Sequence, residues 1–156
     1  MATLNANALT SLARTKSEID ILVDDTRFDD MVIQYINTAS DAIELMCNRV
    51  FRQQDYSHRL NGNGLQWLPL QQFPATALDV VYVDNDWVFG ATSVVPVTTQ
   101  SLIHLETFLV RRGKCNNWPA LQPLNIQVDY TAGYATIPDG LQAACIEFVR
   151  YLYLSQ

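Results

Sequence analysis

Apolar residues recur every three or four positions over residues 26–51, a spacing that predicts a long amphipathic helix. These apolar positions are Phe28, Val32, Tyr35, Ala39, Ala42, Ile43, Met46 and Val50. Thr26 is expected to cap the helix, and the carboxylates of Asp29 and Asp30 suit the positive end of its dipole. A helix of this span would be about 38 Å long, so we expect it to form the spine of the fold.

Two further helices are predicted, one near each end of the chain. Residues 8–20 form a short helix capped by Thr10 or Ser11, and Pro138 opens a last helix over residues 139–155. The last helix is apolar nearly all round, with a narrow polar gap at Gln142, Glu147 and Arg150. Such a helix is normally buried on most sides. Either the rest of the domain or a neighbouring subunit is expected to cover its outer side.

Residues 52–131 carry the patterns of strands and turns. The sequence Asn61–Gly64 is a strong turn signal between the segments 56–60 and 65–68, and it predicts a hairpin. A second hairpin is predicted between residues 78–83 and 87–89.

Two more strand patterns follow. Residues 102–110 form an apolar run, and residues 124–130 alternate between apolar and polar side chains, as in a strand with one buried face. The expected fold is therefore α+β and mainly helical. It is a helical bundle of the long central helix and the C-terminal helix, with β-hairpin arms, in a single domain over residues 1–156.

Composition narrows the class of protein. A chain of 156 residues suits one domain, and its 17% of charged residues lies below the usual ~25%, which favours a surface partly covered by partners. The net charge of −6 argues against a general nucleic-acid binder and a polybasic membrane anchor. The sequence shows neither a signal-peptide pattern nor an apolar run of ~18 residues, so we expect a soluble protein without a membrane partner.

The residue types that carry catalysis and metal binding are few. Cys47, Cys115 and Cys145 are odd in number and form no CxxC pair, so neither a disulfide framework nor a zinc site is indicated. Cys47 and Cys145 fall on apolar helical faces, with nothing nearby to lower a thiol pKa. His58 and His104 are expected to be ordinary strand residues. We therefore expect no catalytic residue, no metal, no cofactor and no enzymatic activity.

The most specific segment of the chain is residues 129–144. A strand ends in Tyr130-x-Ala-Gly-Tyr, a short loop reaches Pro138, and a helix begins with Leu141-x-x-Ala. Gly133 lets the chain leave the strand through a φ that other residues avoid. This segment resembles the signature of the head–tail connector (adaptor) proteins of tailed bacteriophages. The matching residues are Tyr130, Ala132, Gly133, Tyr134, Pro138 and Leu141.

The resemblance extends over nearly the whole chain in order and pattern. The short N-terminal helix, the acidic linker Asp24-Asp25, the long helix ending near residues 49–51 and the strand at residues 78–83 all follow the family's sequence of elements. Residues 90–123, which include the basic stretch 111–114, depart from the pattern.

The resemblance implies a structural protein of the virion neck. Family members assemble as a ring, typically of twelve copies, under the portal protein and extend the DNA channel towards the tail. The implied partners are further copies of the chain, the portal protein, a downstream neck or tail protein, and packaged DNA that passes without specific binding. Assembly is expected in the host cytoplasm. The alternatives are a stopper or a tail terminator, which are usually β-rich without a long helical spine, or a cellular protein- or DNA-binding module.

An acidic segment with Arg27 as its only base has three interpretations, and its carboxylates are Glu18, Asp20, Asp24, Asp25, Asp29 and Asp30. It can be a solvated linker and helix start. It can line the ring channel, where it would repel DNA phosphates. It can also pair with basic residues of the next subunit and fix the register of a heterologous interface.

The basic loop with Arg111, Arg112 and Lys114 is expected to be solvated, to contact protein or to contact DNA. The terminal helix supplies the other interface candidates, Tyr151, Tyr153 and Leu154. Each large apolar side chain buried there would contribute roughly 1.5–3 kcal/mol.

Overall fold

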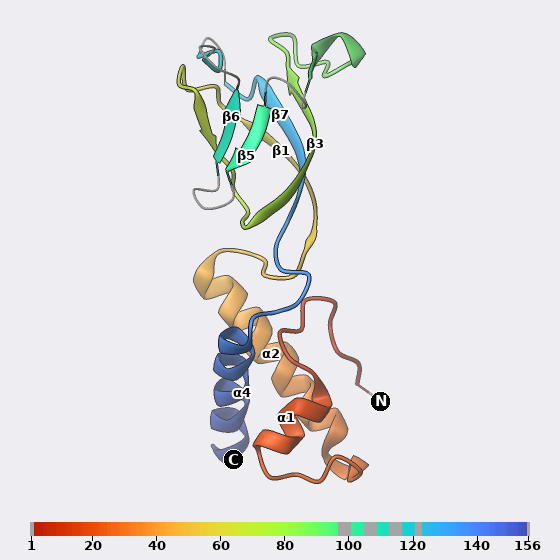
Figure 1. The fold of residues 1–156 in the computed structure, drawn as a ribbon. Helices are drawn as coiled ribbons and strands as arrows, with labels where there is room; N and C mark the ends of the chain where they lie inside the picture. Colours follow the sequence, from red (N-terminus) through yellow and green to blue (C-terminus); the bar gives the residue numbers. More distant parts are fainter. Residues whose placement is uncertain (1, 97–100, 105–108, 113–116, 121–122, 156) are drawn as a thin grey trace. The chain divides into compact units, whose positions relative to one another are not determined.

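The structure is a computed structural model, and it consists of two compact units (Figure 1). It describes residues 2–96, 101–104, 109–112, 117–120 and 123–155. The helical unit comprises Met1–Arg52 and Tyr134–Gln156, and the β unit comprises Gln53–Gly133. The predicted α+β class is confirmed. The strands, however, build a unit with a hydrophobic core of its own rather than separate arms.

The short N-terminal helix α1 spans Leu12–Glu18. Its N-cap is Ser11, whose Oγ accepts a hydrogen bond from the Arg14 N–H. The prediction of a capped helix in this region is therefore confirmed, with Ser11 rather than Thr10 as the cap.

The central helix α2 spans Asp29–Cys47 and is shorter than expected. One turn of 3₁₀ helix, η1 (Thr26–Phe28), precedes it, and Asp25 caps that turn. Thr26 as the cap of α2 was therefore wrong. Asn48 ends the helix in a left-handed conformation (φ 49°), so α2 is about 28 Å long.

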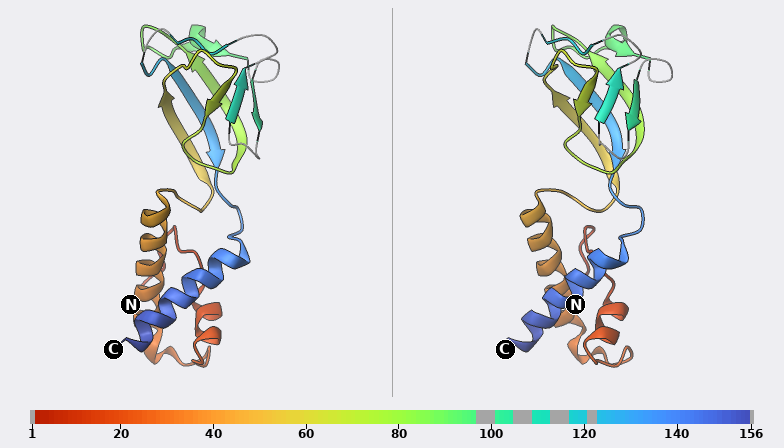
Figure 2. Two further views of the ribbon diagram at one scale, coloured as in Figure 1. Left: turned by 90° about the vertical axis from the view of Figure 1, so that its left-hand side faces the viewer. Right: turned by 60° about the vertical axis from the view of Figure 1, so that its left-hand side comes forward.

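The buried face of α2 contains only some of the residues expected from the apolar pattern. It consists of Val32, Ile33, Ile36, Ala39 and Ser40. Helix α4, Asp139–Leu154, crosses α2 and covers this stretch (Figure 2). The last turn of α2 extends past these contacts, so Met46, predicted to be a core residue, is 84% exposed.

The polar stripe of α2 is occupied by the N-terminal segment of the same chain. The Asn37 amide accepts a hydrogen bond from the Asn5 N–H and donates one to the Thr3 carbonyl, both at 2.9 Å. The Asn7 amide donates to Glu44 at 2.8 Å. The segment is thus held along the helix through hydrogen bonds to side chains.

Helix α4 begins after Pro138, as predicted, and buries one side only. Its buried residues are Cys145, Ile146 and Val149. The core of the helical unit combines residues of α2, α4 and the connecting segments, with Leu12 of α1 packed against it: Ala8, Leu9, Ile19, Val32, Ile36, Ala39, Phe51, Ile137, Cys145 and Val149.

The larger sheet of the β unit has four antiparallel strands in the order β1-β7-β3-β4. The strands are β1 (Gln54–Leu60), β7 (Ile126–Ala132), β3 (Ala75–Val83) and β4 (Val94–Val95), with the 3₁₀ turn η2 (Ala91–Ser93) before β4. Alternate residues of β7, from Ile126 to Ala132, are fully buried. The prediction of a strand with one buried face is confirmed.

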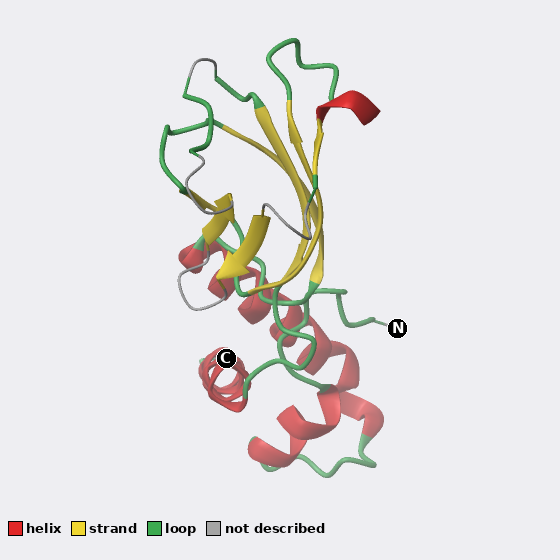
Figure 3. Ribbon diagram, turned by 45° about the horizontal axis from the view of Figure 1, so that its top comes forward, coloured by secondary structure: helices red, strands yellow, loops and turns green. Residues whose placement is uncertain are grey.

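The smaller sheet has the order β2-β6-β5 and lies over one face of the larger sheet (Figure 3). Its strands are β2 (Trp67–Pro69), β6 (Leu109–Arg112) and β5 (Ser101–His104). The core between the sheets includes Leu68 of β2, Val81 of β3 and the fully buried Trp118. The predicted run 102–110 covers parts of β5 and β6, and its residues 105–108 lie outside the described residues.

Both predicted hairpins were wrong. β1 pairs with β7 instead of the following segment, and the turn after it binds a distant loop: the Gly62 N–H donates to the Asn125 side chain at 3.1 Å. Residues 87–89 form no strand. They lie in a loop that is held by the Asp84 carboxylate, which accepts hydrogen bonds from the Phe89 N–H and the Ser93 hydroxyl.

Candidate interface surfaces

The outer side of α4 is an exposed apolar surface. Tyr151 is 67% exposed and Leu154 is 72% exposed, while Tyr153 is half-buried. The rest of the domain therefore leaves this side of α4 uncovered, and cover by a neighbouring subunit stays a prediction. The uncovered side of α4 carries two of the three residues predicted to form an interface.

A second exposed apolar group, which the sequence analysis did not predict, lies at the end of α2. Leu45 and Met46 are both more than 80% exposed, and Cys47 beside them is exposed too. Cys47, predicted to fall on an apolar helical face, is therefore not part of the core. The left-handed Asn48 ends α2 just after these exposed residues, and periodicity alone carries no signal for their exposure.

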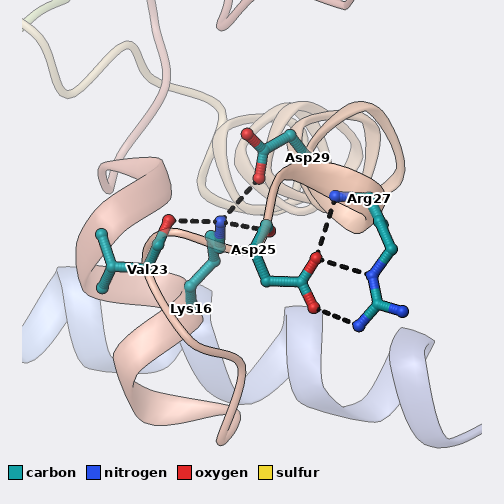
Figure 4. A network of polar contacts seen from close by, with 5 residues as sticks. All are labelled: Lys16, Val23, Asp25, Arg27 and Asp29. Atoms are coloured by element: carbon teal, nitrogen blue, oxygen red, sulfur yellow. Dashed lines mark hydrogen bonds and ion pairs between the residues drawn. The ribbon is translucent and has the colours of Figure 1, made fainter.

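The acidic segment is organised around Lys16, a base that the sequence analysis overlooked (Figure 4). The Lys16 side chain is 1% exposed. Its Nζ donates hydrogen bonds of 2.7 Å to the carbonyls of Val23 and Asp25 and to the Asp29 carboxylate. A buried ammonium group is tolerated because all three of its N–H donors have partners.

Asp25 binds Arg27 in the same segment through a two-pronged ion pair. The Arg27 Nε and Nη2 donate to the two oxygens of the carboxylate at 2.9 and 2.7 Å. These side-chain hydrogen bonds, with one from the Arg27 main-chain N–H, lower the pKa of Asp25 to about 2. The same pairing raises the pKa of Arg27.

The four predicted channel-facing carboxylates therefore differ in their surroundings. Asp25 and Asp29 are held by cations of their own chain, and Asp30 accepts a hydrogen bond from the Ala2 N–H. Asp24 is exposed. A role in a channel stays a prediction for all four.

The predicted basic loop begins inside a strand. Arg111 and Arg112 are the last residues of β6, where the backbone of Arg111 pairs with Trp67 of β2 and Leu102 of β5. Their placement in a loop was wrong, whereas their interface role stays a prediction. Lys114 lies outside the described residues.

The motif residues span the point where the chain passes from the β unit back to the helical unit. Gly133 has a φ of 106°, which confirms the backbone demand inferred from the sequence. The Tyr134 N–H donates to the Phe51 carbonyl at 2.7 Å. Ala132 and Tyr130 are fully buried in β7, and Leu141 packs against the helical core.

The Cys145 thiol and the His58 imidazole each contact a hydroxyl group of the same unit. The buried Cys145 thiol contacts the Ser40 hydroxyl at 3.7 Å, and burial raises its pKa. His58 Nδ1 lies 3.0 Å from the Tyr130 hydroxyl, and burial lowers the pKa of His58. Within the described ranges, no group of three His, Cys, Asp or Glu side chains could hold a metal ion.

Comparison with known proteins assigns the family. A family model described as head completion protein matches residues 21–156. The chain belongs to the head completion protein family. This membership gives the chain a structural role in the virion rather than a catalytic one. Its sequence matches no curated protein.

Solved structures share the fold of this head completion protein at low sequence identity. A chain in the virion of a native gene transfer agent (GTA) particle has a TM-score of 0.66 and 16% identity, over 98% of this chain and 82% of that one. A chain in the neck of an empty GTA particle, computed with C6 symmetry, gives 0.65 and 14% over the same shares. A chain in the neck of a native GTA particle, computed with C12 symmetry, gives 0.62 and 16%, over 98% and 84%.

The described helices also bear on membrane insertion. None of them is both long and apolar enough to cross a membrane.

Proposed function

We propose that this head completion protein is a head–tail connector subunit in the neck of a tailed particle. Copies of the chain form a ring between the portal vertex and the tail, and the ring continues the DNA channel. The partners are the portal protein on one side and a downstream neck or tail protein on the other. A ring of twelve copies is the stoichiometry we expect, since one neck with a similar chain was computed with C12 symmetry.

The exposed outer side of α4 is the observation that carries this proposal. Tyr151 and Leu154 lie one helical turn apart and are both mainly exposed, so they present a continuous apolar surface. A ring joins two different surfaces of neighbouring subunits, because a heterologous interface that closes makes a cycle. A few such side chains buried per subunit, each contributing roughly 1.5–3 kcal/mol, suffice for cooperative assembly on a portal template.

The test is assembly of Leu154→Glu on purified portal rings, observed by electron microscopy and mass photometry. The matched control is Leu65→Glu, which places the same charge at an exposed leucine of the β unit. Leu154→Glu should remove most of the bound ring density, whereas Leu65→Glu should leave it intact. Normal assembly of Leu154→Glu would exclude α4 as the interface.

Charge complementarity supplies the register in this proposal. The basic residues Arg111, Arg112 and Lys114 of one subunit pair with the acidic segment of the next. Reversing Arg111 and Arg112 to glutamate should weaken ring assembly or portal docking. Unchanged oligomer size together with unchanged portal binding would reject this pairing.

A channel-facing role for the acidic segment predicts a different result. Neutralising Asp24 and Asp30 to asparagine should then slow DNA release and leave the ring intact, because a less negative wall repels phosphates less. Asp25 and Asp29 are less suitable targets, since each pairs with a cation of its own chain. Release at the normal rate from particles with the double substitution would count against the channel position.

A stopper is the second candidate, and the β unit favours it. Gln53–Gly133 forms a unit with two sheets and its own core, which is more strand structure than hairpin arms provide. Cross-linking mass spectrometry on intact particles separates the two assignments. A connector should cross-link to the portal protein, whereas a stopper should cross-link to a connector and to the tail.

A further inference from the structure

The connection between α1 and α2 presents apolar side chains to solvent. Leu22 and Val23 are both more than half exposed. They line an open cavity of about 340 Å³ together with Ser17, Asp20 and Ile21. The buried Lys16 donates to the Val23 carbonyl at 2.7 Å, so the fold itself holds this part of the connection in place.

Residues 17–24, here named the acidic surface, carry three negative charges and no positive one. Glu18, Asp20 and Asp24 supply these charges, and all three are exposed. None of the three pairs with a cation of the described residues. The acidic surface therefore offers both apolar contact and negative charge to a partner.

The acidic surface adjoins the side of α4 that is proposed as an interface. The Arg150 Nη2 donates to the Glu18 carbonyl at 2.6 Å, and the Arg150 Nη1 pairs with Glu147. Leu154 lies about one turn beyond Arg150 on the same side of α4. One neighbouring subunit can therefore cover the acidic surface and the end of α4 together.

The opposite end of α2 combines exposed apolar side chains with positive charge. Residues 45–52, here named the basic end, carry two positive charges and no negative one. Leu45 and Met46 are more than 80% exposed in the last helical turn. Arg49 and Arg52 follow, and Arg52 is exposed without an ion-pair partner among the described residues.

Two carboxylates of α2 precede the basic end, and both are bound within the chain. Asn7 donates hydrogen bonds to Asp41 at 2.9 Å and to Glu44 at 2.8 Å. The Phe51 N–H also donates to Glu44, at 3.0 Å. Arg52 binds the Ala8 carbonyl instead of a carboxylate, so its charge is available to a partner outside the chain.

The acidic surface and the basic end of one chain cannot contact each other. They lie at the two ends of α2, which is about 28 Å long (Figure 1). Each can reach the other only on a second copy of the chain. Two different surfaces that meet between copies make a heterologous interface, which forms a ring when its rotation closes.

We propose that the basic end of one copy docks on the acidic surface of the next copy. Leu45 and Met46 pack against Leu22 and Val23, and the flexible methionine adapts to the cavity there. The positive charges of the basic end face the carboxylates of the acidic surface, which fixes the register of the contact. This inference rests on the proposed ring and names the surfaces that join its subunits.

Arg111 and Arg112 are the other basic residues proposed to meet the acidic segment, which includes the acidic surface. The basic end fits better, because it offers exposed apolar side chains to Leu22 and Val23 as well as positive charge. Cross-linking separates the two partners, since it reports which position of the next copy lies beside position 22.

Chemical cross-linking through the native Cys47 tests the contact. Cys47 is exposed and Cys145 is buried, and Cys115 is replaced by serine. The full chain with Leu22→Cys is assembled on purified portal rings and treated with a short bismaleimide. A link between positions 22 and 47 must join two chains, because these positions of one chain lie at opposite ends of α2. We expect a ladder of linked species that extends to the full ring.

Three control chains locate the contact. Cys47→Ser added to Leu22→Cys should abolish the ladder, because links between two copies of position 22 stop at the dimer. Leu65→Cys in place of Leu22→Cys moves the new thiol to an exposed leucine of the β unit and should give no ladder. Arg111→Cys combined with Leu22→Cys and Cys47→Ser gives a ladder only if β6 is the partner.

Charge reversal measures the electrostatic part of the contact. Asp24→Arg and Arg52→Glu should each raise the protein concentration needed for ring assembly by about tenfold, the effect of one close charge pair. The two substitutions together should restore assembly, because they exchange the charges. Thermal melting checks that each variant retains its fold, as expected for exposed side chains.

Three cross-linking results would overturn the inference. These are rings on the portal without any link from position 22, rings that give dimers only, and a ladder through position 111. The ring itself is intact in each case, so the proposed function would stand. A charge-exchanged chain that fails to assemble would also count against the inference, and absence of rings from the parent chain would overturn both proposals.

Discussion

Replacing Lys16 with methionine tests how the acidic segment is held. Methionine keeps most of the length and apolar volume of the lysine stem and removes only the ammonium group. Three hydrogen bonds of 2.7 Å disappear, two to main-chain carbonyls and one to the Asp29 carboxylate. The segment between α1 and α2 then lacks the ammonium group that binds its carbonyls.

The expected loss of unfolding free energy is about 3 kcal/mol. Hydrogen bonds to a charged group contribute about 1.5–3 kcal/mol each, so three of them set an upper limit well above that figure. Two effects reduce it. Methionine avoids the desolvation of a buried ammonium, and Asp29, whose side chain is 27% exposed, can regain water on its free carboxylate.

Urea unfolding followed by two signals measures this loss. Circular dichroism at the helix band reports mainly the helical unit, whereas Trp67, Trp87 and Trp118 are all in the β unit, so fluorescence reports that unit. Lys16→Met should lower the midpoint seen by circular dichroism. If both midpoints move together, the chain unfolds as the single domain predicted from its sequence.

The control and the refuting result are well separated. Arg27→Met breaks an ion pair whose arginine is 79% exposed, and it should change the midpoint little. A double-mutant cycle with Asp29→Asn isolates the Lys16–Asp29 term. A loss for Lys16→Met below about 1 kcal/mol, the range of exposed ion pairs, would refute the inference that Lys16 holds the segment.

Three further predictions concern single positions. Because pairing with Arg27 lowers the pKa of Asp25 to about 2, its stabilising contribution is present above pH 3.8 and is lost as the pH falls towards 2; carboxyl NMR titration of Arg27→Met should show this pKa return towards 3.8. Gly133→Ala, at a φ of 106°, should lower the free energy of unfolding by about 1–3 kcal/mol, as measured in urea. Tyr130→Phe removes the acceptor of the Gln72 N–H and should lower the free energy of unfolding by about 1–3 kcal/mol. Hydrogen exchange at the Gln72 amide should accelerate, and an unchanged exchange rate would contradict this hydrogen bond.

Local signals predicted the helices well. The Ser11 cap, Asp29 in the first turn of α2 and Pro138 at the start of α4 all act within a few residues of themselves, so the sequence displays them directly. The end of α2 was harder, because it depends on where α4 stops covering it. Met46 satisfies the helical period and is nevertheless exposed.

Strand pairing depended on contacts far apart in the sequence. The turn signal around Gly62 is real, but the residues in it bind Asn125 and approach Pro119. A Cβ atom on Gly62 would lie 1.5 Å from the Pro119 carbonyl oxygen, so glycine is required there for close approach rather than for a hairpin. Periodicity reports which face of a strand is buried, as it did for β7, and carries no information about its neighbour.

The candidate interface was only partly visible in the sequence. The apolar character of α4 pointed to Tyr151 and Leu154, which are exposed. Lys16 was missed because a lysine in a short amphipathic helix usually faces water. Its burial arises from the fold of the segment after α1, which brings two carbonyl groups to its amine.

The two chain connections between the units lie side by side. Arg52 and Tyr134 form a parallel bridge, and the Tyr134 N–H binds Phe51, so the 81 residues between them leave and return at one place. Insertions between neighbouring backbone positions are well tolerated, because the host fold need not change to accommodate them. The 53–133 segment can therefore change in length while the chain of the helical unit keeps its path.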